Sequence, residues 1–173
     1  MIIRPDGSQD EDKDTIRDME VWGLQTSLTG RIAMPKLDKQ DQRIATIFGT
    51  EEVPGVNTAT LTRYLEHLTQ HLELPCQLTG IEDFDWEEYY VIGPGSKAEH
   101  ERLRKTRPSC MDTYELLSFE DDVDLDAGLL VNVRRVSDKK QFLLPLAGLE
   151  VTTKKAKNYP LLDDYAVWFV NWR

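Results

Sequence analysis

The hydrophobic pattern of this chain changes its period at Pro75, and this change most strongly limits the folds available to it. Between Asn57 and Glu73 apolar residues recur every three or four positions, which is typical of a helix with one packed face. Asn57 or Thr58 is suited to cap its start, and Pro75 ends the run. Beyond Pro75 short β-branched and aromatic runs favour strands. We therefore expect a helix over 57–73 followed by an antiparallel sheet.

Short strand-like segments follow Pro75, separated by Gly, Pro, Asp or Ser. They cover residues 76–84, 86–93, 112–119, 129–136, 141–146 and 166–172. Residues 137–140 predict a hairpin turn, and Pro145 predicts one 3₁₀ turn before another short strand. Small SH3-like barrels are commonly completed in this order. The expected fold class is α+β, with a small antiparallel β-barrel or sheet, SH3-like, preceded by a helical N-terminal segment.

The N-terminal part of the chain carries weaker signals. We interpret residues 1–55 as an extension, partly flexible or with short helices, and 56–173 as the main α+β domain. The polar stretch 5–20 predicts a mobile acidic lead or a weakly held helix. Small apolar groups near 22–28 and 44–48 predict short helical turns that pack on the main domain. Within that domain, residues 96–109 predict a short exposed helix or a long loop.

The charge balance of the chain limits its partners. It has 31 acidic and 21 basic side chains, a net charge of −10 with neutral histidines. Such a surface repels nucleic acids and anionic membranes, and it attracts cations and basic proteins. No apolar run reaches about 18 residues, the length of a membrane span, and the N-terminus lacks the pattern of a secretory signal. We expect a cytoplasmic protein that binds neither nucleic acid nor a membrane.

Acidic residues gather in two windows, 82–88 and 120–126. Two like charges about 5 Å apart repel by roughly 1 kcal/mol in water and by about 3 kcal/mol at an effective dielectric constant of 20. A hard divalent cation relieves this repulsion, and Ca²⁺ accepts carboxylate and carbonyl oxygens in a tolerant geometry. Neither window contains His or Cys, which disfavours zinc and copper. The windows therefore predict Ca²⁺ as the cofactor.

The second window supplies the first candidate ligands, Asp122, Asp124 and Asp126. Their alternate spacing is similar to the opening of an EF-hand. However, Gly128 falls one place too late, and Val133 occupies the position where an EF-hand requires Glu. Any calcium site in this window is therefore of another type.

Three separated blocks of the chain resemble the CcbP family of small acidic calcium-binding proteins, first recognised in cyanobacteria. They are LPCQLTGIEDFDWEEYYVIGPG, LRKTRPSCMDTYELLSFEDDVDLDAGLLVNVRRVSDKKQFLLPLAGLEV and NYPLLDDYAVWFVNWR, within residues 57–173. The resemblance implies calcium binding through acidic side chains without EF-hands. It also implies a role as a cytosolic calcium buffer or regulator.

A second group of candidate ligands depends on how the chain end returns to the sheet. Asp163 and Asp164 would meet either Asp112, at the start of a strand, or Glu88 and Asp83 of the first window. In an equally weighted alternative, Asp163 and Asp164 cap a turn through the neighbouring backbone.

Two rival functions use the same residues differently. As an interaction module, the acidic clusters and exposed aromatics would contact a basic protein partner, although we expect most aromatics to lie in the core. An enzyme is not expected, because the acids lie in exposed clusters and no GxSxG motif marks a nucleophile. His67 and His71 lie four positions apart but off the apolar stripe, which favours a solvated surface.

Calcium binding predicts a change in stability. If only the folded chain binds the ion, a free Ca²⁺ concentration about a hundredfold above Kd raises the free energy of unfolding by about 2.7 kcal/mol. Thermal denaturation should therefore show a melting temperature that rises with Ca²⁺ and falls with chelator. Equal shifts with Mg²⁺ would indicate general charge screening instead.

Overall fold

In the computed structural model, which describes residues 37–173, the change of period at Pro75 is the passage from helix α2 (Thr58–His71) to strand β1 (Gln77–Gly80). Asn57 caps α2 reciprocally: its side chain accepts a hydrogen bond from the Thr60 amide, and the Thr60 hydroxyl accepts one from the Asn57 amide. The predicted helix over 57–73 is confirmed. The predicted lead over 5–20 and the helical turn near 22–28 lie outside the described residues.

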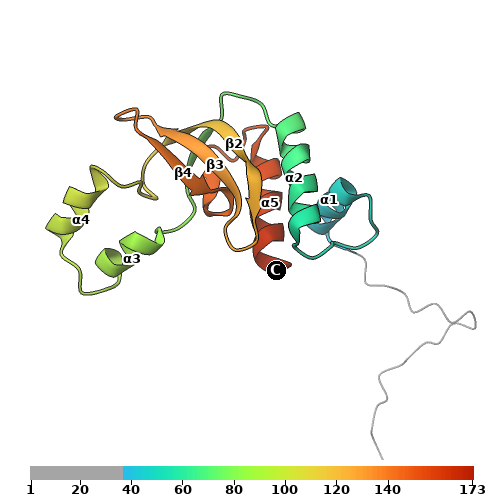
Figure 1. The fold of residues 1–173 in the computed structure, drawn as a ribbon, viewed down its shortest axis with the longest axis horizontal. Helices are drawn as coiled ribbons and strands as arrows, with labels where there is room; N and C mark the ends of the chain where they lie inside the picture. The colour runs from blue at the N-terminus through green and yellow to red at the C-terminus, as the bar shows by residue number, and fades with distance from the viewer. Residues whose placement is uncertain (1–36) are drawn as a thin grey trace, which may run out of the picture. The chain divides into compact units, whose positions relative to one another are not determined.

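The five strands form one antiparallel sheet in the order β4-β3-β2-β1-β5. The remaining strands are β2 (Tyr114–Asp124), β3 (Gly128–Arg135), β4 (Gln141–Pro145) and β5 (Leu149–Val151), and a 3₁₀ turn η1 (Leu146–Gly148) joins β4 to β5. The hairpin at 137–140, the 3₁₀ turn and the short strand after it are confirmed. The α+β class with an antiparallel sheet is also confirmed, but the sheet is not closed into a barrel (Figure 1).

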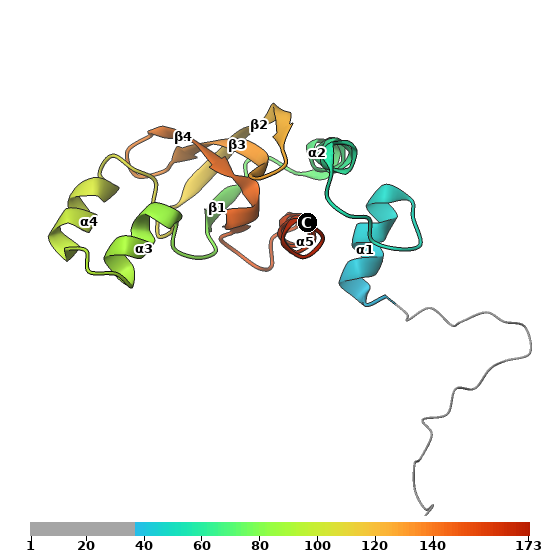
Figure 2. The same ribbon diagram turned by 60° about the horizontal axis from the view of Figure 1, so that its bottom comes forward.

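Helices α2 and α5 (Tyr159–Asn171) cover one face of the sheet (Figure 2). Alternate residues of β3 are fully buried on that face, as expected for a strand with one packed side. The Tyr64 ring of α2 stacks on Trp168 of α5, with ring centroids 4.9 Å apart, and meets Tyr165 edge-on at 5.2 Å. These three aromatic side chains are fully buried and join both helices into one core.

Helix α1 (Lys39–Phe48) packs against both α2 and α5. Its Ile44 is fully buried and its Phe48 ring lies 5.2 Å from Trp168, centroid to centroid. The helical turn predicted near 44–48 is therefore confirmed. Contacts group Leu37–Arg173 into one compact unit that includes α1.

Two predicted strands are wrong, because residues 85–91 and 159–171 form helices α3 and α5. In α5 the buried residues Leu162, Tyr165 and Trp168 recur every three positions, a helical spacing that the run 166–172 alone is too short to display. Pro160 stands in the first turn, where its missing amide hydrogen costs nothing.

Helix α3 (Asp85–Val91) was mistaken for a strand because its aromatic residues resemble a strand pattern. A strand would place Glu87 and Tyr89 on the same face. Instead Glu87 is fully buried and the Tyr89 side chain is 56% exposed. The helix turns Tyr90 inward, where it stacks on His100.

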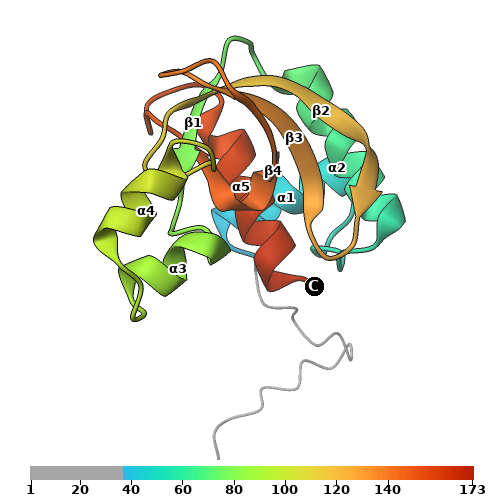
Figure 3. The same cartoon turned by 60° about the vertical axis from the view of Figure 1, so that its left-hand side comes forward.

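Helices α3 and α4 (Lys97–Arg104) lie side by side, and the strands of the sheet separate them from α2 (Figures 1 and 3). The helix predicted within 96–109 is confirmed as α4. Buried Arg135 of β3 fastens the end of α4 to the sheet by donating to the backbone carbonyls of Arg104 and Arg107 at 2.8 and 2.9 Å.

The turn into β3 provides a test of the packing around α5. Gly128 has φ +76°, and an added Cβ would lie 2.5 Å from the Tyr165 hydroxyl, whereas a Cβ at Gly148 meets no atom within 4 Å. We expect Gly128→Ala to lower the free energy of unfolding by about 2 to 4 kcal/mol, through backbone strain and the clash. Gly148→Ala is the control and should change it by less than about 1 kcal/mol. Urea denaturation measures both, and equal losses would contradict the packing described.

Candidate functional site

Helix α3 is oriented by a carboxylate that points into the protein. The Glu87 side chain is fully buried and accepts hydrogen bonds from the Ser109 hydroxyl at 2.6 Å and the Cys110 amide at 2.8 Å. His100 contributes a contact at 3.1 Å, and the Phe84 amide donates at 3.3 Å. Burial alone would raise the pKa of Glu87, but these hydrogen bonds outweigh it and hold the pKa below its ordinary value.

The inward position of Glu87 turns its acidic neighbours toward solvent. Asp85 and Glu88 are exposed, and Asp83 is half-buried just before the helix. A pocket of about 410 Å³, here called the acidic pocket, lies beside them. Its lining residues are Glu82, Asp83, Phe84, Asp85, Trp86, Pro108, Leu144, Pro145 and Gly148. Three carboxylates therefore share one pocket with an apolar floor.

The carboxylates around the acidic pocket lack neutralising cations within the described chain. No Lys or Arg lines the pocket, and no ion pair within residues 37–173 involves Glu82, Asp85 or Glu88. Asp83 accepts a hydrogen bond from the Cys110 thiol at 3.2 Å. Burial, followed by the contact with Asp83, raises the pKa of Cys110 to about 12, so the thiol keeps its proton at pH 7.

The first candidate ligands, Asp122, Asp124 and Asp126, lie at the end of β2 and in the turn to β3, and all three are exposed. One Asp124 oxygen accepts hydrogen bonds from the amides of Asp126 and Ala127, both at 2.7 Å, and these bonds lower the pKa of Asp124. The turn therefore uses this carboxylate for its own backbone. Asp126 lies 3.8 Å from the Arg173 guanidinium.

Asp163 and Asp164 face helix α1. Asp164 is buried and receives two hydrogen bonds from the Arg43 guanidinium, at 2.6 and 2.7 Å, with a third from Gln40 at 3.0 Å. Asp163 accepts from Gln40 at 3.0 Å and from the Tyr159 hydroxyl at 3.2 Å. Both carboxylates therefore join α5 to α1, and the structure brings neither to Asp112 or Asp83.

Asp112 lies next to the buried guanidinium of Arg135. It accepts from Arg135 at 2.9 Å and from the Ser109 amide at 3.1 Å, and Arg104 lies 3.6 Å away. Two cations thus neutralise this carboxylate.

Within residues 37–173, no three His, Cys, Asp or Glu side chains are placed to hold a metal ion. Beyond the β2–β3 turn, the candidate ligands differ in their partners. Asp112, Asp163 and Asp164 have internal partners that satisfy them. Asp83 and Glu88 lie in the acidic segment 82–88, where Glu82 and Asp85, absent from the predicted ligands, join them. A helical interpretation of 85–91 would have placed Asp85 and Glu88, three positions apart, on one exposed face.

Comparison of the chain with family models, curated proteins and solved structures finds no match. In the described part of the chain, no helix has the length and apolar character needed to cross a membrane.

The neighbouring residues Glu87 and Glu88 provide a matched pair for testing the buried network. Glu87→Gln should lower the free energy of unfolding at pH 7 by about 2 to 3 kcal/mol, because it weakens charge-assisted hydrogen bonds. Exposed Glu88→Gln should change it by less than about 0.5 kcal/mol.

The contribution of Glu87 to the free energy of unfolding should depend on pH. The pKa of Glu87 is lowered by folding, so its contribution is complete above the ordinary value of 4.5 and is lost as the pH falls through the folded pKa. Urea denaturation at a series of pH values should show the gap between the wild type and Glu87→Gln closing below pH 4.5. A gap that widens in acid would contradict the network.

Proposed function

We propose that this chain is a non-enzymatic calcium-binding protein that lacks EF-hands and binds Ca²⁺ through the acidic segment 82–88. The observation that carries the proposal is the gathering of Glu82, Asp83 and Asp85 around one pocket that no Lys or Arg lines. Glu88 adds a fourth carboxylate on the exposed face of α3. Asp112, Asp163 and Asp164 have internal partners, and Asp124 stabilises a turn. The side chains of Asp121 and Asp122 are exposed and form no hydrogen bond or ion pair within residues 37–173, but segment 82–88 is preferred because three of its carboxylates line one pocket.

The donor atoms in this segment suit calcium in kind. Carboxylate oxygens are hard ligands, and Ca²⁺ accepts them in mono- or bidentate form together with carbonyls and water. Because no three side chains within residues 37–173 are already arranged around one ion, binding requires the carboxylates to draw together. Glu87 keeps the backbone of α3 in place, while Glu82, Asp85 and Glu88 are free of hydrogen bonds to the described residues. The affinity then depends on side-chain rearrangement.

The resemblance to the CcbP family supports this proposal and extends it to the fold. We include in it an SH3-like relationship, because the meander β2-β3-β4, the 3₁₀ turn and the pairing of β5 with β1 follow the order expected of such domains. A cytoplasmic role as a calcium buffer or regulator completes the proposal. A regulator must change shape when the ion binds, whereas a buffer need not.

Two double variants locate the site. Asp83→Asn with Asp85→Asn should weaken Ca²⁺ binding at least about tenfold, equivalent to about 1.4 kcal/mol, because two charges leave the pocket. Asp122→Asn with Asp126→Asn removes the same charge from the β2–β3 turn, spares Asp124, and should change the affinity less than about twofold. Isothermal titration calorimetry of chelator-treated protein provides the measurement.

The results separate the alternatives clearly. If the wild type gives no saturable heat with millimolar Ca²⁺, the proposed function is wrong. If the second pair of substitutions weakens binding and the first does not, calcium binds at the β2–β3 turn, and the position proposed for the site is wrong.

A second candidate function is an acidic interaction module for a basic protein partner. The apolar floor of the acidic pocket favours it, since Phe84 and Trp86 lie beside the carboxylates. Trp86 already holds the Arg107 guanidinium over its ring, 5.5 Å from the centroid. Two results together would favour this function over the first. The protein would give no heat when titrated with Ca²⁺, and a Lys- or Arg-rich peptide would bind the wild type more tightly than the double variant Asp83→Asn with Asp85→Asn.

A further inference from the structure

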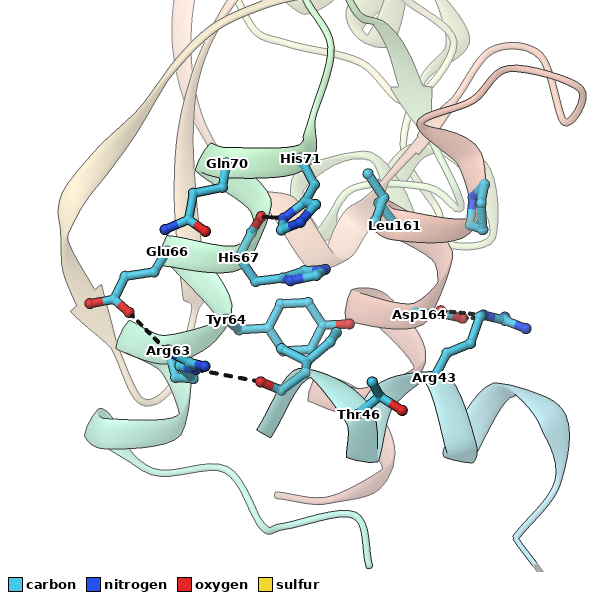
Figure 4. Close-up of a pocket in the computed structure, with 12 residues that line it drawn as sticks. Arg43, Thr46, Arg63, Tyr64, Glu66, His67, Gln70, His71, Leu161 and Asp164 are labelled. Carbon is cyan, nitrogen blue, oxygen red and sulfur yellow. Dashed lines mark hydrogen bonds and ion pairs between the residues drawn. The ribbon is translucent and has the colours of Figure 1, made fainter. Parts of the chain in front are cut away.

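A second groove lies between helices α1, α2 and α5 (Figure 4). Its volume is about 480 Å³, within the usual range for small-molecule sites. Ile47 and Leu161 supply apolar wall, and Arg43, Arg63, His67 and His71 supply nitrogen-bearing groups. The predicted calcium ligands other than Asp164 do not line it.

The charges around this groove differ from those of the chain as a whole. The chain carries a net charge of −10, yet two Arg and two His line the groove beside two acids. One of these acids, Asp164, is buried and receives the Arg43 guanidinium on both oxygens. The other, Glu66, forms only a long contact of 3.7 Å with Arg63 at the surface. Arg43 and Arg63 each donate one further, long hydrogen bond of 3.4 Å, to the Lys39 and Ile47 carbonyls. Because each guanidinium has five N–H donors, some of them remain for a ligand.

Tyr64 places a polar group without a partner at the floor of the groove. Its side chain is fully buried, and its hydroxyl has no hydrogen-bond partner among residues 37–173. In Figure 4 the hydroxyl points from α2 into the space between α2 and α5, toward the side where Asp164 and Arg43 lie. Burial raises the pKa of Tyr64, so the group keeps its proton and is a hydrogen-bond donor. A buried donor without an acceptor is unfavourable, and a ligand oxygen would satisfy it.

The two histidines are not arranged to chelate a metal ion. Their rings stack with centroids 4.2 Å apart, so they lie parallel rather than converging on one point. His71 Nδ1 lies 2.8 Å from the His67 carbonyl oxygen, which can only accept, so this nitrogen carries a proton. No side-chain hydrogen bond within residues 37–173 fixes the His67 ring, which covers the Tyr64 edge with centroids 6.2 Å apart.

We propose that the groove binds a small organic anion, whose carboxylate or phosphate group accepts a hydrogen bond from the Tyr64 hydroxyl and is attracted by Arg43 and Arg63, which lie on opposite sides of Tyr64 (Figure 4). The apolar part of the ligand packs on Ile47 and Leu161. Guanidinium groups suit both classes of anion, because their forked donors match carboxylate and phosphate oxygens. This site is separate from the calcium proposal and does not depend on it.

Benzoate, phenyl phosphate and inorganic phosphate are the probes, and binding is followed by ligand-induced shifts in melting temperature and by calorimetry. Benzoate and phenyl phosphate should bind more tightly than inorganic phosphate, because only they supply an apolar body. Their relative affinity distinguishes a carboxylate from a phosphate site. Weak ligands have dissociation constants in the millimolar range, so each probe is titrated to about 10 mM. If none of the three probes shows saturable binding in that range, the proposal is wrong.

Variants test whether the observed binding uses the groove. Tyr64→Phe removes only the hydroxyl, so it should raise the melting temperature of the free protein and weaken anion binding about tenfold, or about 1.4 kcal/mol. Arg63→Gln should weaken binding to a similar degree. Arg102→Gln is the matched control, since Arg102 is also exposed and also pairs with a Glu three positions away, but on α4.

Two results would contradict the proposal. If Tyr64→Phe and Arg63→Gln both bind the anion as tightly as the wild type, the anion binds elsewhere. If Arg102→Gln loses as much anion affinity as Arg63→Gln, the binding reflects general charge attraction. Calcium titration of the same variants keeps the two sites distinct, since none of these substitutions should change the calcium heat.

Discussion

The buried carboxylate of Glu87 determines what the protein presents on helix α3. Four hydrogen-bonding groups surround it, from the loop before α3, from α4 and from the segment that leads into β2. Because a helix turns about 100° per residue, one fixed inward side chain also fixes the outward direction of Asp85 and Glu88. The acidic surface of α3 therefore follows from a satisfied internal charge. Without Glu87, a two-turn helix with three acids would lose its hydrogen bonds to α4 and to the segment that leads into β2.

The described chain treats its acidic residues in three different ways. Some join elements, as Asp164 joins α5 to α1 and Asp112 meets Arg135. Asp124 stabilises a turn through backbone amides. Within the described residues Glu82, Asp85 and Glu88 have neither role. Together with Asp83, which accepts a hydrogen bond from the Cys110 thiol, they supply the negative charge on which the proposed function is based. Meanwhile the stacked aromatic core of Tyr64, Tyr165 and Trp168 supports the groove with two arginines.

Much of the fold could be predicted because its signals are local. The capped helix at 57–73, the hairpin at 137–140 and the 3₁₀ turn after Pro145 each depend on residues close in sequence. The helices α3 and α5, which the sequence pattern favours as strands, are rich in aromatic residues. Their true period emerges only over longer windows, as in α5, or through a distant partner, as Ser109 is for Glu87 of α3. The candidate site was predictable only as an acidic window. Which acids remain without partners depends on distant residues, Arg43 for Asp164 and Arg135 for Asp112, and no pattern of spacing reveals these pairs.

Calcium binding by segment 82–88 is tested most directly by an anomalous difference map from a crystal of the protein grown or soaked in calcium. The account predicts a peak within coordination distance, about 2.3 to 2.6 Å, of carboxylate oxygens from Glu82, Asp83, Asp85 or Glu88. It also predicts that Glu87 keeps its buried contacts while those side chains turn toward the ion. A map without a peak in this segment at millimolar calcium, with the four carboxylates still directed apart, would contradict the account.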